Sequence, residues 1–206
     1  MNKVRIAVLV SGGGTNLQAL IDSERSGVIT SGEIVLVISD NKDAYAIERA
    51  KNNNIETEVL LKKDFPSKED HEKALVGTLK DHDIDLIVLA GFMSILSPYF
   101  IEAFRDRIIN IHPSLIPSFC GKGFYGLKVH EAALNYGVKV TGATVHFVNE
   151  IPDGGRIIIQ KAVEVKEGDT PEILQRRVME EAEWKILPMA CQMVCQKIME
   201  EKTDVQ

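Results

Sequence analysis

The sequence predicts an α/β fold with a Rossmann-like, doubly wound and mostly parallel sheet, an antiparallel C-terminal hairpin edge and a long C-terminal helix. Short runs of aliphatic and β-branched residues, as at 4–10, 33–39 and 84–90, alternate with amphipathic stretches, which is typical of βαβ units. Near the C-terminus two strand-like runs follow each other directly, which predicts a hairpin instead of another crossover.

Size, charge and cysteine content limit the classes of function. The 206 residues predict a single domain over 1–200 and a frayed tail at 201–206. A net charge of −6 argues against a nucleic-acid partner, and no apolar run approaches the length of a membrane span. Cys120, Cys191 and Cys195 have neither disulfide nor metal-ligand spacing, so we expect reduced thiols, a cytoplasmic protein and no metal.

A phosphate site is predicted where the first strand, at 4–10, meets the first helix. Between them lies the turn Ser11-Gly-Gly-Gly-Thr-Asn16, and the helix continues through Leu17. Backbone N–H groups at a helix N-terminus attract anions, and glycine lets a phosphate approach the backbone. Leu17 stands where a dinucleotide-binding fingerprint has its third glycine, and a tight turn without a ligand is the alternative.

The alternation continues through the N-terminal half. Asp40 follows the strand at 33–39, where a dehydrogenase would bind a ribose, although Asp40-Asn41 is also a common turn and N-cap pair. The strand at 84–90 ends in Gly91-Phe-Met-Ser94, which should border the same crevice as the glycine turn. Further helices are expected at 44–51, at 67–80 and from Ser97-Pro98 onward, and a further strand at 57–61.

The chemistry is expected between residues 107 and 125. An apolar run around Ile109 predicts a buried strand, in which Asn110 and His112 would lie side by side on one face at the carboxyl end. An amide donor beside an imidazole suits a reaction that develops negative charge on a carbonyl oxygen. The alternative is a turn-capping asparagine and an ordinary buried histidine. The loop at 114–126, rich in Pro, Ser, Gly and aromatic residues, is predicted to be functional.

The C-terminal third predicts a helix at 127–136, strands at 139–148 and 157–165, and a final helix. Asp153 lies at the tip of the predicted hairpin, before two glycines, where a plain turn aspartate is the alternative. The final helix is expected to begin at Thr170-Pro171 and to run to about Lys197, with a kink or break at Pro188.

Together these segments resemble a known enzyme family. VLVSGGGTNLQAL, VLAGFMSILSP, NIHPSLIPSF, TGATVHFVNE and DGG are similar to the phosphoribosylglycinamide formyltransferases, and the resemblance covers nearly the whole chain. It implies transfer of a formyl group from 10-formyltetrahydrofolate to the amine of glycinamide ribonucleotide in purine synthesis, without a metal. It also implies a phosphate-binding N-terminal half and a catalytic, folate-binding C-terminal half, with a monomer and a homodimer both open.

The resemblance also implies roles for individual residues. The catalytic residues would be Asn110, His112 and Asp153, and Asp153 would raise the pKa of His112, so that the rate depends on a group titrating near or above neutrality. The ribonucleotide would bind to Gly13, Gly14, Thr15, Asn16 and Glu183, with Glu181 as the weaker alternative to Glu183. The folate would bind to Lys68, Met93, Ser94, Ile95, Leu96 and Asn110.

Two residues depart from the family pattern, and several rivals stay open. Ser94 and Lys68 stand where family members have arginine, which concerns folate binding and leaves the reaction class unchanged. In addition, 121–126 looks like an insertion that lengthens the loop after the catalytic strand and reshapes the entrance of the site. A methionyl-tRNA formyltransferase or a formyltetrahydrofolate hydrolase would need an additional domain. A nicotinamide-dependent oxidoreductase would leave the predicted catalytic residues unexplained, and a nucleotide-binding module would bind without turnover.

Overall fold

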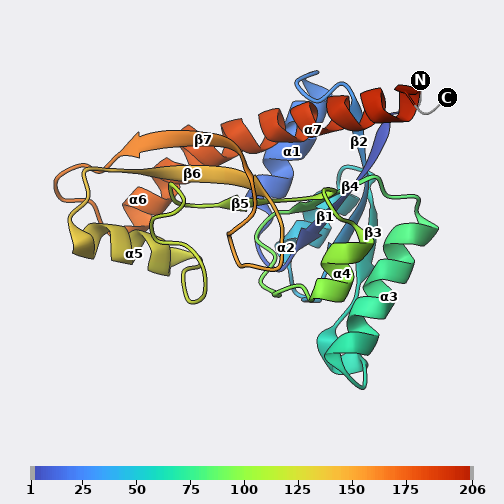
Figure 1. Ribbon diagram of the computed structural model, residues 1–206. Coiled ribbons are helices and arrows are strands. Elements are labelled where there is room, and N and C mark those ends of the chain that lie inside the picture. The colour runs from blue at the N-terminus through green and yellow to red at the C-terminus, as the bar shows by residue number, and fades with distance from the viewer. Residues whose placement is uncertain (1–2, 205–206) are drawn as a thin grey trace.

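The computed structural model describes residues 3–204 and contains one seven-stranded sheet in the order β3-β2-β1-β4-β5-β6-β7 (Figure 1). The first five strands in this order run parallel, and β6 and β7 add an antiparallel edge. The predicted fold class is therefore confirmed. The strands are β1 (Val4–Val10), β2 (Gly32–Ser39), β3 (Glu56–Val59), β4 (Leu86–Leu89), β5 (Ile108–His112), β6 (Val140–Phe147) and β7 (Ile157–Glu164).

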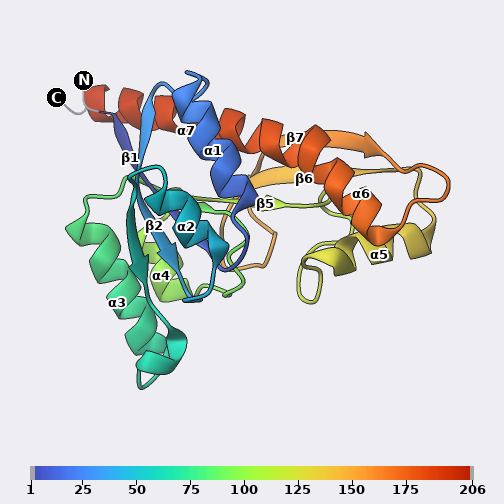
Figure 2. The same ribbon diagram turned by 180° about the vertical axis from the view of Figure 1, so that it is seen from behind.

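Helices cover both faces of the sheet (Figures 1 and 2). One face carries α1 (Thr15–Arg25), α2 (Tyr45–Lys51) and α7 (Trp184–Asp204), and the other carries α3 (Lys68–Asp81) and α4 (Pro98–Ala103). Beside β6 and β7, α5 (Leu127–Tyr136) packs against α6 (Pro171–Val178). None of the described helices is both long and apolar enough to cross a membrane.

The central strand β1 explains why the predicted strands are continuous apolar runs. Its residues alternate between the two faces: Ile6 and Val8 pack on the side of α1 and α7, whereas Ala7 and Leu9 pack on the side of α3 and α4. All four are fully buried. A parallel strand covered by helices on both faces has no solvent side, so polar residues are expected only near or beyond its ends, as with the exposed Arg5 at the start of β1.

Two helix starts have the predicted caps. Ser97 accepts a hydrogen bond from the backbone N–H of Phe100, and Pro98 is the first residue of α4. Thr170 accepts one from the N–H of Ile173, and the first residue of α6 is again a proline. A hydroxyl at the N-cap satisfies a free N–H group of the first turn. Proline at the first helical position has no N–H group, so one unpaired donor fewer remains.

The final helix differs from the prediction. It does not break at Pro188; instead α6 leads through a π-helical turn, η2 (Met179–Glu183), into α7, which continues past this proline to Asp204. A π turn is a common site of helix irregularity and is found often at functional sites. The irregularity therefore precedes the proline and falls on the predicted substrate residue Glu183.

The structure extends the final helix into the expected frayed tail, over 201–204. These residues belong to α7, and Glu201 forms an ion pair with Arg107, with 2.6 Å between Oε2 and Nη2. Lys202 forms a second ion pair, with 2.5 Å between its Nζ and Oδ1 of Asp85. Ile198 is buried one turn earlier in the helix. Contacts with the residues that immediately precede β5 and β4 thus hold the last turns, while residues 205 and 206 lie outside the described part of the chain.

Candidate active site

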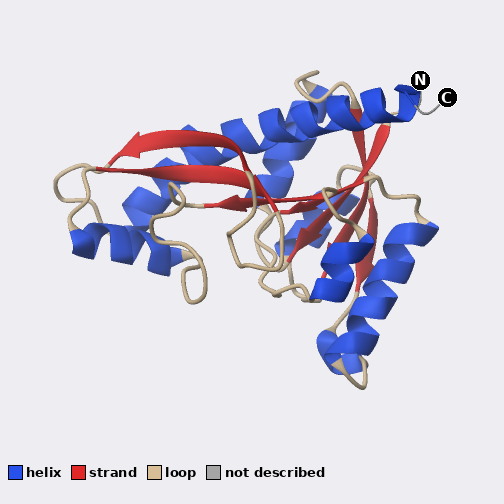
Figure 3. Ribbon diagram, viewed as in Figure 1, coloured by secondary structure: helices blue, strands red, loops and turns tan. Residues whose placement is uncertain are grey.

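The strand pairing of β5 sets the centre of the site. Ile109 and Ile111 pack in the core below α7, so Asn110 and His112 point to the opposite face. The antiparallel register of β5 and β6 places Asn110 opposite His146, and His112 opposite Thr144. The loops at 113–126 and 148–156, drawn in tan in Figure 3, hang on the side of the sheet away from α7.

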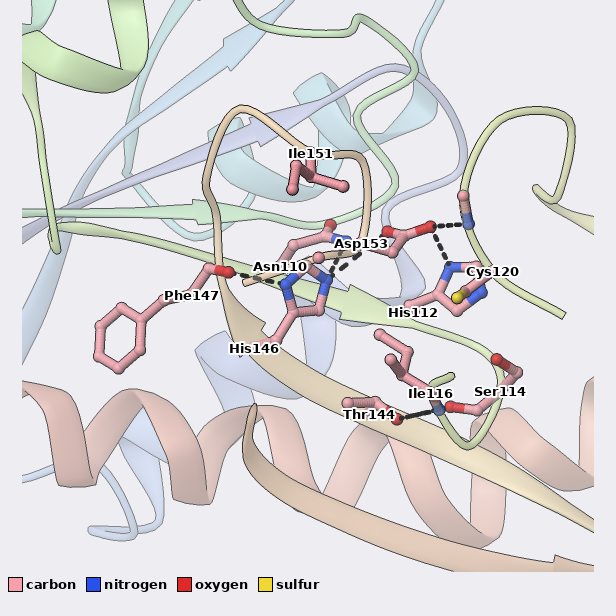
Figure 4. A network of polar contacts seen from close by, with 12 residues as sticks. Asn110, His112, Ser114, Ile116, Cys120, Thr144, His146, Phe147, Ile151 and Asp153 are labelled. Carbon is pink, nitrogen blue, oxygen red and sulfur yellow. Dashed lines mark hydrogen bonds and ion pairs between the residues drawn. The ribbon is translucent and has the colours of Figure 1, made fainter. Parts of the chain in front are cut away.

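Asp153 reaches this face from the turn between β6 and β7. Its backbone has a φ of 55°, a left-handed conformation that aspartate tolerates better than most residues. Oδ2 lies 3.5 Å from Nδ1 of His112, and Oδ1 lies 3.6 Å from Nε2 of His146. Oδ2 also accepts a hydrogen bond of 2.8 Å from the N–H of Gly121 (Figure 4). The structure thus brings Asn110, His112 and Asp153 together.

His146 is the residue of this cluster that sequence reasoning missed. Its Nε2 lies 3.2 Å from Nδ2 of Asn110, and its Nδ1 lies 2.8 Å from the carbonyl oxygen of Phe147. Because that carbonyl can only accept, Nδ1 carries the proton and Nε2 of a neutral His146 accepts from Asn110. The alternation in 139–148 already places His146 on one face with Thr144, and its pairing with β5 was the signal that could have found it.

The proton positions on His112 follow from similar reasoning. Its Nε2 lies 2.9 Å from the carbonyl oxygen of Phe119, so that nitrogen donates and the side of the ring with Nδ1 faces Asp153. A neutral His112 therefore presents the lone pair of Nδ1 to the site. A proton arriving at Nδ1 would turn the contact with Asp153 into an ion pair.

Burial lowers the pKa of His112 below its ordinary 6.5, although the carboxylate of Asp153 acts in the opposite direction. This corrects the expectation that Asp153 would bring the pKa to neutrality or above. Burial also acts to raise the pKa of Asp153, but His146 and His112, when they are protonated, and the N–H of Gly121 outweigh it and hold that pKa below its usual value. At neutral pH the site therefore contains a neutral imidazole beside a carboxylate.

A second set of hydrogen bonds shapes the loop after β5. Oγ1 of the buried Thr144 donates to the carbonyl of Ser114 at 2.6 Å and accepts from the N–H of Ile116 at 3.1 Å (Figure 4). The side chain of Gln160, on β7, donates to the same Oγ1 and to the carbonyl of Ile116. The loop that carries Phe119 over His112 is thus fastened to β6 and β7.

A close backbone approach explains the glycines after Asp153. A Cβ atom built on Gly155 would overlap the carbonyl oxygen of Phe147, next to the hydrogen bond that Phe147 N–H donates to the carbonyl of Arg156. We expect Gly155→Ala to displace the turn and to lower kcat by about 10²-fold, because small misplacements of reacting groups are costly. Activity and circular dichroism test this expectation. Gly77→Ala, at a glycine of α3 where an added Cβ meets no other atom and φ is not positive, is the control for the replacement of a glycine itself.

The glycine turn and the C-terminal helix form a second cluster. Gly14, at a φ of 71°, is the N-cap of α1, whose first N–H groups have no acceptor within the helix. Nδ2 of the buried Asn16 donates to Oε2 of Glu183 at 2.7 Å, and Thr15 lies against Met179. Arg49 donates to the carbonyl oxygen of Gly13 at 2.8 Å. The structure thus gathers the residues predicted to bind the ribonucleotide.

Glu183 is favoured over Glu181 by position. Glu183 is buried in the π turn and contacts Asn16, whereas Glu181 is exposed. Burial raises the pKa of Glu183, and the hydrogen bond from Asn16 acts against that shift. Oδ1 of Asn16 has no partner among the described residues.

Most of the residues predicted to bind folate lie in the segment after β4, whereas Lys68 lies apart from them on α3. Met93 and Ile95 are exposed at the carboxyl end of β4, and Leu96 is buried. Ser94 donates to Oδ2 of Asp40 at 2.5 Å, so its hydroxyl is engaged within the protein. Lys68, in the first turn of α3, lies 3.6 Å from the buried carboxylate of Glu72, and the structure does not bring it to His112 or Asp153.

His130, on α5, is a further buried histidine, and it lies close enough to His112 for a positive charge there to act on the pKa of His130. It has no exposed surface, and neither ring nitrogen has a hydrogen-bond partner among the described residues. Burial lowers its pKa from 6.5 to about 4. The unfolded chain therefore binds a proton that the folded protein excludes between pH 6.5 and about 4, and stability should fall as the pH falls through that range.

Replacing His130 with phenylalanine should remove that sensitivity. We expect the free energy of unfolding of the wild type to lose about 3 kcal/mol more than that of His130→Phe between pH 7 and pH 4. Urea unfolding at a series of pH values measures the difference. His82→Gln is the control: its pKa is raised by Thr78 and Glu56, so its removal should act in the opposite direction. Parallel curves for wild type and His130→Phe would contradict the expectation.

In the described part of the chain, no group of three or more His, Cys, Asp or Glu side chains is placed to hold a metal ion. Asn110, His112, His146 and Asp153 form instead a set of proton donors and acceptors at the carboxyl edge of the sheet. In open α/β sheets this edge is where ligands bind. The arrangement can hold a carbonyl oxygen, accept a proton and stabilise the resulting positive charge.

Comparison with known proteins assigns the family. The sequence profile described as formyl transferase matches residues 4–191. The phosphoribosylglycinamide formyltransferase of Haemophilus influenzae is 43% identical over 185 residues, which cover 90% of this chain and 84% of that protein. The trifunctional purine biosynthetic protein adenosine-3 of Gallus gallus is 46% identical over 193 residues, but this chain spans only 18% of its length.

Solved structures agree with the sequence relatives. Glycinamide ribonucleotide transformylase 1 from Symbiobacterium toebii superposes with a TM-score of 0.89 at 44% identity, over 95% of this chain and 89% of that chain. Phosphoribosylglycinamide formyltransferase from Brucella melitensis gives a TM-score of 0.86 at 42% identity, over 94% and 96%. The chain therefore belongs to the formyl transferase family, and within that family it is similar to phosphoribosylglycinamide formyltransferases.

Proposed function

We propose that the protein transfers the formyl group of 10-formyltetrahydrofolate to the amine of N1-(5-phosphoribosyl)glycinamide, giving formylglycinamide ribonucleotide and tetrahydrofolate in purine synthesis. The observation that carries the proposal is the approach of Asp153 to His112, at 3.5 Å, beside the amide of Asn110. Those three side chains come from β5 and from a turn some forty residues later, and they meet in a chain of the formyl transferase family.

The reaction begins when the amine nitrogen attacks the formyl carbon. A C–N bond forms, the carbonyl oxygen becomes anionic, and the attacking nitrogen must lose a proton. Neutral His112 takes this proton at Nδ1, and Asp153 stabilises the imidazolium as its counter-ion. The bond between the formyl carbon and N10 of the folate then breaks, N10 receives the proton from His112, and the carbonyl re-forms.

Asn110 stabilises the anionic oxygen of the tetrahedral intermediate. Its amide nitrogen carries two N–H groups, of which one is directed to Nε2 of His146 and the other is left for the substrate. A fixed donor aimed at developing negative charge is worth roughly 3–4 kcal/mol in enzymes of this kind. His146 orients that donor through its own hydrogen bond to the carbonyl of Phe147.

The ribonucleotide lies along the glycine turn and α1. The phosphate binds to the backbone of Gly13 and Gly14 and to the first N–H groups of α1, at Thr15 and Asn16, where the helix dipole favours an anion. Glu183 accepts hydrogen bonds from the ribose hydroxyls. Its contact with Asn16 supports this role because it places an acceptor beside the phosphate seat.

The folate lies between the 92–96 segment and the hairpin turn. Exposed apolar side chains border this region, namely Met93, Ile95 and Ile151, and Ile151 stands above Asp153 in Figure 4. Ser94 and Lys68 are engaged by Asp40 and Glu72, so the pterin is bound by the backbone and apolar surface of the segment and by Asn110. The three cysteines are free, which supports a reducing, cytoplasmic site of action.

One assay tests the proposed function. The protein is mixed with 10-formyltetrahydrofolate, with and without glycinamide ribonucleotide, while the absorbance of the folate is followed. Tetrahydrofolate that appears only with the ribonucleotide supports transfer. Tetrahydrofolate without it would indicate hydrolysis, and an unchanged folate in both mixtures would contradict the proposal.

A further inference from the structure

The segment from Phe92 to Leu96 has neither helical nor strand structure, so side-chain contacts must define its conformation. At its beginning the backbone N–H of Met93 donates to Oγ of Ser11 at 2.9 Å, and Oγ of Ser94 donates to Oδ2 of Asp40 at 2.5 Å. Both contacts lead to one carboxylate, because Oγ of Ser11 donates to Oδ1 of Asp40 at 2.6 Å.

Asp40 joins three neighbouring strands of the sheet. It follows β2, Ser11 follows β1, and Ser94 lies in the segment after β4, in the strand order β2-β1-β4. The side chain of Asp40 is only 10% exposed, and each of its oxygens receives a hydroxyl. Hydrogen bonds to a charged acceptor are stronger than neutral ones, particularly when they are largely shielded from water.

The far end of the same segment has a similar clamp. The buried carboxylate of Glu72, on α3, accepts hydrogen bonds from the backbone N–H and the hydroxyl of Ser97, and Lys68 balances its charge. The 92–96 segment is thus held between two acidic side chains. Asp40 is the one that also touches Ser11, the first residue of the glycine turn.

We propose that Asp40 is a positioning residue for formyl transfer, which fixes the 92–96 segment in the conformation that receives the folate. The inference rests on the proposed function. The glycine turn itself depends less on Asp40, because the carbonyl of Ser11 accepts from Asn41 Nδ2 and the N–H of Ser11 donates to the carbonyl of Gly91. Loss of the carboxylate should therefore loosen folate binding and leave ribonucleotide binding largely intact.

The variant Asp40→Asn tests this selectivity. Asparagine keeps the shape of the side chain. However, it can accept a hydrogen bond at only one of the two positions to which the hydroxyls of Ser11 and Ser94 donate. We expect the KM for 10-formyltetrahydrofolate to rise by about tenfold, while the KM for the ribonucleotide and kcat change by less than about threefold. Asp43→Asn, at an exposed aspartate of the same turn, removes the same charge and should leave all three values unchanged.

A double-mutant cycle with Ser94→Ala shows whether the carboxylate acts through this hydroxyl. If it does, the rise in folate KM of Asp40→Asn/Ser94→Ala is clearly smaller than the product of the two single rises. Should Asp40→Asn fail to fold, Ser94→Ala and Ser11→Ala carry the test, each with an expected rise in folate KM alone.

The outcomes separate the two proposals. A wild type that catalyses no formyl transfer overturns the proposed function and this inference with it. An active wild type overturns the inference alone if the folate KM of Asp40→Asn equals that of Asp43→Asn. Equal rises in both KM values would also overturn it, because they would indicate a general loosening of the fold.

Discussion

Replacing Asp153 with asparagine is expected to lower kcat by about 10³- to 10⁴-fold and to leave the fold intact. Asparagine tolerates the left-handed backbone at this position, where φ is 55°, so the turn should keep its shape. The loss comes from His112: without the carboxylate, a protonated His112 is a buried charge without a counter-ion. Steady-state kinetics together with circular dichroism measure both effects.

The same variant should change the pH dependence in a defined direction. His112 accepts the proton in its neutral form, so kcat/KM should rise with pH through a pKa that burial holds below 6.5. Asp153 is the group that raises this pKa, and its removal should move the acid limb of the profile to still lower pH. Glu150→Gln, in the same hairpin turn, removes a charge without touching either histidine. An acid limb that stays in place in Asp153→Asn would contradict this role.

Replacing Asn110 with alanine is expected to lower kcat by about 10²- to 10³-fold, with little change in the KM for the ribonucleotide. The amide acts on charge that exists only in the transition state, so its loss should appear in kcat and kcat/KM together. Asn135→Ala, at an exposed asparagine of α5, is the control. A loss in Asn110→Ala of less than about threefold would assign the oxyanion to another donor.

The parallel half of the fold could be predicted from the sequence because those strands are buried on both faces. Runs such as 4–10 are apolar and buried except for Arg5 near the start, and the residues that end them turn toward one edge of the sheet. The proximity of Asn110 and His112 followed from the two-residue period of a strand. The hairpin that delivers Asp153 followed from two adjacent apolar runs around a Pro-Asp-Gly turn.

The features that could not be predicted from the sequence depend on contacts between distant segments. His146 joins the site through the register of β5 and β6, which no local pattern specifies. The direction of the pKa shift of His112 depends on how far the loop at 113–121 covers the ring. The contacts of Glu201 with Arg107 similarly stabilise a last turn that composition alone predicts to fray.

The role of Asp40 also depends on residues that are distant in the sequence. Its position after β2 suggested either a turn cap or a ribose ligand, and both readings considered only neighbours in the sequence. In the structure the two oxygens of Asp40 instead accept hydrogen bonds from the hydroxyls of Ser11 and Ser94, which follow other strands of the sheet.

In the proposed mechanism Asp153 acts through His112, and kcat values for His112→Gln, Asp153→Asn and the double variant test this coupling directly. If the carboxylate works only through the imidazole, the double variant should be no slower than His112→Gln alone. A double variant that loses the product of the two single effects would contradict the account, because Asp153 would then act on the substrates independently of His112.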